Sequence, residues 1–167
     1  MLGCGQSTPV PPRPPQRAQI ERYLAEVEPI RLAVNKLLEG ADPTFHALAA
    51  HRISRGEAAR RIGALERRFA GYTVAIAALL PPSPQLRALN APYAETYVLE
   101  DAYLSALTAG IAEDELDHLP DTQSAQRAAI IRWRTGLTVL AHAAHAPLPA
   151  DLQQAGRGEI APSPSGS

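Results

Sequence analysis

The sequence predicts an all-α fold, an antiparallel up-down four-helix bundle with kinked helices. One observation is a set of large apolar residues at steps of three and four: Ile62, Leu65, Phe69, Tyr72, Ile76 and Leu79. This spacing places all six side chains on one stripe of a helix. Three further segments repeat the pattern. The composition agrees, because the chain is 46% hydrophobic but only 5% aromatic, which suits closely packed helices.

The first helix is expected from about residue 15 to residue 39. Its apolar residues recur every seven positions in two registers, Ile20-Val27-Val34 and Tyr23-Ile30-Leu37. Pro29 lies inside this pattern and should kink the helix, since proline lacks an amide N–H and crowds the carbonyl four residues earlier. Gly40 ends the helix.

The second helix is expected from about residue 55 to residue 80 and carries the stripe described above. A short amphipathic segment that begins at Asp42-Pro43 precedes it. Ser54 followed three residues later by Glu57 is a capping-box pattern, which places a break between the two segments. Pro81 and Pro82 end the second helix.

The third and fourth helices are expected at about residues 84–115 and 122–146. Both carry apolar residues at the three-four spacing, and Pro92 gives the third helix its own kink position. Short connections between long helices favour antiparallel neighbours, and hence the up-down order.

The chain divides into three parts. Residues 1–15 form a proline-rich arm, residues 16–148 the helical bundle and residues 149–167 a loose polar tail. The tail has little apolar surface to bury apart from Leu152, which is expected to dock against the bundle.

The charge and the cysteine content of the sequence exclude several classes of function and of site. The 16 basic and 17 acidic residues leave a formal net charge of −1, whereas a nucleic-acid binder usually carries a clear basic excess. We therefore expect no nucleic-acid partner.

No apolar run approaches the ~20 residues that a bilayer-spanning helix needs. Cys4 is the only cysteine in the sequence, which excludes an intramolecular disulfide and a cysteine zinc site within it.

The residues around Cys4 carry the one resemblance to a known class of protein. Leu2-Gly3-Cys4 stands ahead of the proline-rich stretch 6–15 and resembles the end of a bacterial lipoprotein signal. The whole chain resembles small uncharacterised helical lipoproteins of actinobacterial-type bacteria. The resemblance implies that Cys4 becomes a lipid-carrying N-terminus and that a signal segment precedes Met1 in the gene. The arm would then hold the bundle away from the membrane, at ~3 Å per residue.

Glu100 occupies a position of the third helix where the pattern requires an apolar side chain. One interpretation is a buried carboxylate that binds a metal or transfers protons, with its pKa moved by burial. The interpretation we favour is structural: an ion pair or hydrogen bond with Arg61, Arg68 or a tyrosine hydroxyl that fixes the register of the helices. The tyrosines themselves either line a small-molecule pocket or belong to the core, which is the more common role.

Two patterns have the spacing of metal ligands. Glu115 and His118 match the Glu-x-x-His motif of ferritin-like di-iron bundles, but the motif occurs once and stands beside Pro120. His142 and His145 lie three residues apart near the end of the fourth helix, where a histidine more often complements the helix dipole. We therefore expect no metal site, no cofactor and no catalytic residue.

These observations lead to one hypothesis and two alternatives. The hypothesis is a non-enzymatic, extracytoplasmic helical-bundle lipoprotein of the cell envelope. Lipid on Cys4 anchors it to the membrane, and the bundle acts as an interaction or small-ligand-binding module. One alternative is a cytosolic helical binding or regulatory protein in which Leu2-Gly3-Cys4 is coincidental. The other is a carboxylate/histidine metal-dependent enzyme.

Overall fold

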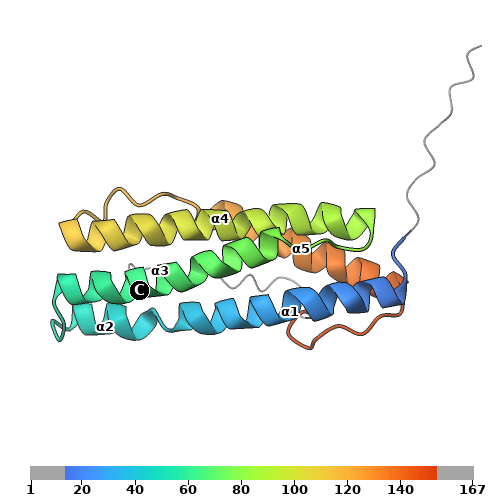
Figure 1. Cartoon of the computed structure of the whole chain (residues 1–167), viewed down its shortest axis with the longest axis horizontal. Coiled ribbons are helices and arrows are strands. Elements are labelled where there is room, and N and C mark those ends of the chain that lie inside the picture. The colour runs from blue at the N-terminus through green and yellow to red at the C-terminus, as the bar shows by residue number, and fades with distance from the viewer. Residues whose placement is uncertain (1–13, 154–167) are drawn as a thin grey trace, which may run out of the picture.

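The computed structural model describes residues 14–153, and over this range the regular structure is entirely helical (Figure 1). The helices are α1 (Arg17–Glu39), α2 (Asp42–Ala49), α3 (Arg55–Ala77), α4 (Pro84–Glu113) and α5 (Gln123–Ala143). The four long helices, α1, α3, α4 and α5, pack against one another. The predicted fold class, an all-α four-helix bundle, is confirmed.

Successive long helices run in opposite directions, in the up-down order. Figure 1 shows α3 returning beside α1, α4 returning beside α3, and α5 running back beside α4. The short α2 continues the line of α1 and packs on the end of α3 that α1 does not reach. The connection between α4 and α5 runs back along α4, so α5 lies in the half of the bundle that holds α1. One end of the bundle therefore holds α1, α4 and α5, and α3 joins them toward the middle of the molecule (Figure 1).

The helix ends follow local sequence signals. Ser54 Oγ accepts a hydrogen bond of 3.1 Å from the amide of Glu57, and Ser83 Oγ accepts one of 3.1 Å from the amide of Leu86. Each serine satisfies an amide of a first helical turn that has no partner within the helix. The predicted break before α3 is confirmed. Both α1 and α4 continue past their internal prolines.

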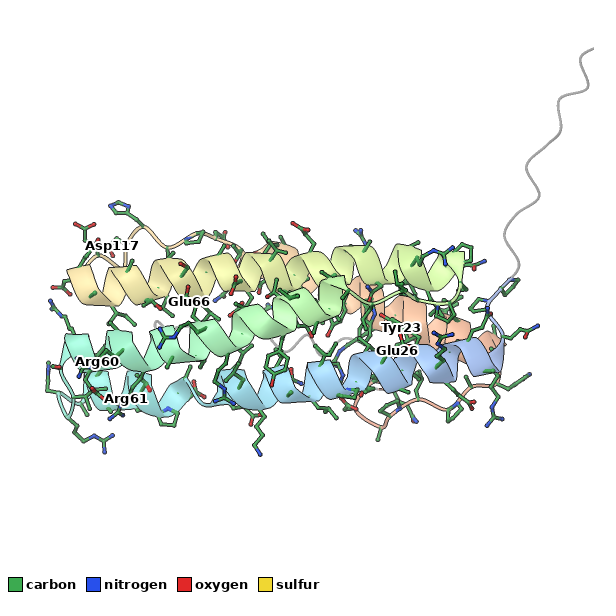
Figure 2. The ribbon with its side chains drawn as sticks, viewed as in Figure 1. Tyr23, Glu26, Arg60, Arg61, Glu66 and Asp117 are labelled. Atoms are coloured by element: carbon green, nitrogen blue, oxygen red, sulfur yellow. The ribbon has the colours of Figure 1, made fainter. Side chains whose placement is uncertain are left out.

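The predicted stripe of α3 faces the core. Ile62, Leu65, Phe69 and Ile76 are buried, and Tyr72 is half-buried against them. Burying an aliphatic or aromatic side chain of this size contributes about 1.5–3 kcal/mol relative to leaving it exposed. The charged residues of the helix lie outside this stripe. Figure 2 shows Arg60 and Arg61 at the end of the bundle that holds α2.

The first residues of the predicted tail contact the bundle. Leu152 is 1% exposed, and Asp151 Oδ2 lies 2.6 Å from Nη1 of Arg31 on α1. Contact with the bundle therefore extends past the predicted boundary at residue 148. No helix within residues 14–153 is both long enough and apolar enough to cross a bilayer.

Candidate functional site

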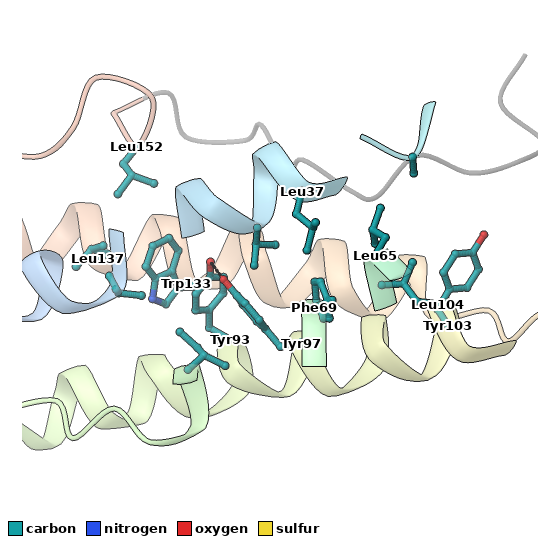
Figure 3. Packing of buried hydrophobic residues seen from close by; sticks show 14 of the residues in the cluster. Leu37, Leu65, Phe69, Tyr93, Tyr97, Tyr103, Leu104, Trp133, Leu137 and Leu152 are labelled. Atoms are coloured by element: carbon teal, nitrogen blue, oxygen red, sulfur yellow. Dashed lines mark hydrogen bonds between the residues drawn. The ribbon is translucent and has the colours of Figure 1, made fainter. Parts of the chain in front are cut away.

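A row of aromatic rings fills the core where the four long helices meet. Tyr93 stacks on Trp133 with ring centroids 4.2 Å apart and meets Tyr97 edge-on at 5.5 Å. Tyr97 in turn stacks on Phe69 at 5.8 Å. Figure 3 shows these four rings in sequence along the core. Each such pair contributes about 0.5–1.5 kcal/mol beyond its buried area, so the row holds α3, α4 and α5 in one register.

The polar atoms of this aromatic row find hydrogen-bond partners inside the core, some of them on Tyr23 of α1. The Tyr23 hydroxyl accepts a hydrogen bond of 2.8 Å from Trp133 Nε1 and donates one of 2.8 Å to Asn90 Oδ1. The hydroxyls of Tyr93 and Tyr97 lie 3.2 Å apart. Burial raises the pKa of each of these three tyrosines, so all three hydroxyls stay neutral at physiological pH.

A cavity of about 60 Å³ lies beside the row, with walls from all four long helices. Its aromatic walls are Phe69, Tyr93 and Tyr97, and its polar wall includes Glu100 and Gln126. One water occupies roughly 30 Å³ in the liquid. The cavity therefore has room for about two waters or for one small polar head group.

Glu100 is the charged member of this cavity. Its side chain is buried, at 6% exposure, and within the described range Oε1 has no hydrogen-bond partner. Burial raises the pKa of Glu100 to about 7, although a side-chain hydrogen bond with Gln126 acts in the opposite direction. At neutral pH the carboxyl group is therefore close to the midpoint of its titration, in a position without a neighbouring cation.

The observed partner of Glu100 corrects the predicted pairing with Arg61 or Arg68. Arg61 Nε lies 2.8 Å from Glu57 Oε1, one turn earlier on the same helix, and Arg68 is exposed. Within residues 14–153 no ion pair joins either arginine to Glu100. The reason is the rotation of α3, which directs Phe69 into the core at this level and leaves the arginines outside it.

Arg31 is a buried charged residue whose burial was not predicted from the sequence. Its Nη2 lies 2.6 Å from Glu28 Oε2, and its Nη1 lies 2.6 Å from Asp151 Oδ2. Burial alone would lower the pKa of Arg31, but the two carboxylates outweigh burial and hold the pKa above its ordinary value. A signal was available, because Arg31 stands between Val27 and Val34 at the spacing of the apolar stripe of α1.

Arg134 is a second buried arginine that the sequence reading missed. It is 4% exposed, and its Nε has no hydrogen-bond partner in the part of the chain that the structure describes. Together with Arg31, Tyr93 and Trp133 it lines a cavity of about 30 Å³. A signal was available, because Arg134 stands four residues after Ile130 and three before Leu137, at the spacing of the apolar stripe of α5.

The structure does not bring the residues of the two predicted metal-ligand patterns together into a metal site. Glu115 and His118 follow the end of α4 and both are exposed, so the helical Glu-x-x-His geometry does not form. His142 lies in the last turn of α5, and His145 lies beyond that helix. In the described part of the chain, no three side chains of histidine, cysteine, aspartate or glutamate gather at a spacing suited to a metal ion.

Cys4, the predicted lipidation site, lies outside the described residues, so its modification stays a prediction. The chain matches no protein-family model, and neither a curated protein nor a solved structure is significantly similar to it.

Proposed function

We propose that this chain is a non-enzymatic, extracytoplasmic lipoprotein of the cell envelope. In this proposal lipid on Cys4 anchors the protein to the membrane. The helical bundle is the working part, an interaction or small-ligand-binding module held outside the membrane.

The observation that carries the proposal is the order of segments at the start of the chain. Leu2-Gly3-Cys4 comes first, the proline-rich stretch 6–15 follows, and α1 begins at Arg17. A lipid-modified cysteine supplies the membrane affinity. A proline-rich spacer keeps an extended conformation at ~3 Å per residue.

The geometry of the bundle supports this arrangement. Pro15 is buried, and α1 starts at one end of the long axis of the bundle (Figure 1). An anchor at Cys4 would therefore attach the bundle by that end. The helices would then extend away from the membrane surface, with their long faces free for partners.

The experiment is expression of the native gene, including its upstream sequence, in a bacterial host that processes lipoproteins. We expect the wild-type protein in the membrane fraction and in the detergent phase after phase partition. Mass spectrometry should find an N-terminal peptide that begins at Cys4 and carries diacylglycerol. The Cys4→Ser variant, which lacks only the acceptor sulfur, should remain in the aqueous phase.

Recovery of both proteins in the cytoplasmic fraction, with an unmodified thiol on Cys4 of the wild type, would contradict the proposal. That result would favour the alternative of a cytosolic binding or regulatory protein.

A further inference from the structure

We propose that the cavity beside Glu100 binds the ammonium head group of a small amine. In this site the Glu100 carboxylate is the counter-ion, and the rings of Phe69, Tyr93 and Tyr97 are the walls. The inference rests on the small-ligand-binding form of the proposed function. It does not depend on the lipid anchor, so either one can fail without the other.

The first argument is charge. A buried carboxylate is costly unless a cation or several hydrogen bonds compensate it. Arg31, in the same core, shows the usual compensation, with carboxylate oxygens of Glu28 and Asp151 each at 2.6 Å. Glu100 has the amide of Gln126 as a hydrogen-bond partner, and among residues 14–153 its buried Oε1 has none. In the described part of the chain no cationic side chain pairs with it, so the cavity lacks a positive charge.

The second argument is the chemistry of the walls. The face of an aromatic ring attracts a cation, and the attraction strengthens in a desolvated position. Phe69, Tyr93 and Tyr97 line the same cavity as Glu100. Because burial raises the pKa of both tyrosines, their hydroxyls stay neutral and do not compete with the carboxylate. Aromatic walls around a single carboxylate favour an organic cation over a metal ion, which needs more oxygen ligands.

The third argument is size and access. A volume of about 60 Å³ accepts a head group such as methylammonium, but not a drug-sized ligand. Val34 and Asn35 of α1 and Ile130 of α5 also line the cavity. The helices α1 and α5 contact each other far less than α3 and α4 do. The carbon chain of a larger amine would leave along this α1–α5 seam.

The ionisation of Glu100 supports the assignment and makes it pH-dependent. Its pKa of about 7 in the empty cavity means that binding weakens as the pH falls below 7 and the carboxyl takes up a proton. The other titratable groups of the cavity are Tyr93 and Tyr97, which stay neutral. Burial raises the pKa of these two tyrosines, and the positive charge of Arg31 lowers it by a smaller amount. Asp101, the carboxylate next to Glu100 on α4, has its pKa raised by burial and by the negative charge of Glu66 on α3.

The test is a titration of the purified full chain with methylammonium chloride at pH 8, followed by amide chemical shifts in ¹H–¹⁵N NMR spectra. Two non-hydrogen atoms limit the dissociation constant to a few millimolar at best, so the titration extends to tens of millimolar. We expect saturable shifts around the cavity. Methanol, the neutral molecule of similar size, and sodium chloride at equal ionic strength should produce none.

Two comparisons locate the site at Glu100. Glu100→Gln keeps the shape of the side chain and should weaken methylammonium binding at least tenfold, while Glu95→Gln, an exposed change on the same helix, should leave binding unchanged. In the wild type, affinity should fall about tenfold from pH 8 to pH 6, because roughly one tenth of the carboxyl is ionised one pH unit below its pKa.

Three results would overturn the proposal: no saturable shifts with methylammonium, equal shifts with methanol, or undiminished binding at pH 6. Each is measured on the wild type and does not require a variant to fold.

Discussion

Trp133 Nε1 lies 2.8 Å from the hydroxyl oxygen of Tyr23, and this hydrogen bond joins α5 to α1 inside the core. The same hydroxyl donates to Asn90 of α4 at 2.8 Å. Three helices that are distant in sequence therefore meet at one oxygen atom. A slip of any one of them would leave a buried donor or acceptor unpaired, which is costly. This hydroxyl therefore helps to select one register for the bundle.

Removing that hydroxyl should destabilise the protein. Tyr23→Phe keeps the ring but leaves Trp133 Nε1 and Asn90 Oδ1 without a partner, and we expect a loss of about 2–4 kcal/mol in the free energy of unfolding. Urea unfolding followed by the fluorescence of Trp133, the only tryptophan, measures it. Tyr72→Phe is the matched control, since the Tyr72 hydroxyl makes no hydrogen bond to any residue from 14 to 153 and that ring is only half-buried. Equal unfolding midpoints for the two variants would contradict the assigned role.

Two glycines should respond in opposite ways to alanine. At Gly71 an added Cβ would meet nothing within 4 Å, so Gly71→Ala should gain about 0.5–1 kcal/mol from helix propensity alone. At Gly110 the Cβ would lie 2.8 Å from the carbonyl oxygen of Glu115, a backbone atom that cannot rotate away. Gly110→Ala should therefore lose about 1–3 kcal/mol. Thermal unfolding of the two variants checks the prediction, and a gain at both positions would show that the turn after α4 is not tightly held.

The segment after α5 should stabilise the bundle through Leu152. Leu152→Ala should cost about 2 kcal/mol, the lower end of the range for buried leucines, because the segment can detach when its anchor is lost. Amide hydrogen exchange of residues 150–153 should increase in the same variant. Leu80→Ala is the control, since Leu80 is 81% exposed, and it should change stability by less than about 0.5 kcal/mol. Unchanged exchange in Leu152→Ala would mean that this leucine does not hold the segment.

Local signals in the sequence were sufficient to predict the helices and their inner faces. The three-four spacing predicted the buried stripe of α3, and Ser54 marked the start of that helix because a cap needs only residues within one turn. The burial of Glu100 was predicted for the same reason, since it stands at a stripe position. Periodicity gives the inward face of each helix but not the neighbour that meets it.

Contacts between segments distant in sequence explain what could not be predicted. The connection 114–122 carries the chain back along α4, and this places Gln126 rather than an arginine beside Glu100. Arg31 was missed because a long charged side chain in a stripe can reach out of the core to solvent. Its burial depends on Asp151, a residue of the predicted tail.

The last prediction concerns the pH dependence of stability. The pKa of Glu100 is about 7 in the folded protein, against an ordinary value of 4.5. The folded state therefore holds this proton more tightly than the unfolded state does. The resulting stabilisation is fully present below about pH 4.5 and is lost as the pH rises through 7. The difference corresponds to at most about 3 kcal/mol in the free energy of unfolding.

Glu100→Gln should remove this dependence, because an amide does not ionise. The variant should match the wild type near pH 4 and exceed it by up to about 3 kcal/mol at pH 8. The measured quantity is the difference between the two proteins in urea unfolding at each pH, in which contributions from groups other than Glu100 cancel. Glu95→Gln should follow the wild type throughout. If the wild type and Glu100→Gln give parallel curves from pH 4 to pH 8, then burial does not hold the proton on Glu100, and the carboxylate must have a compensating partner in the folded protein.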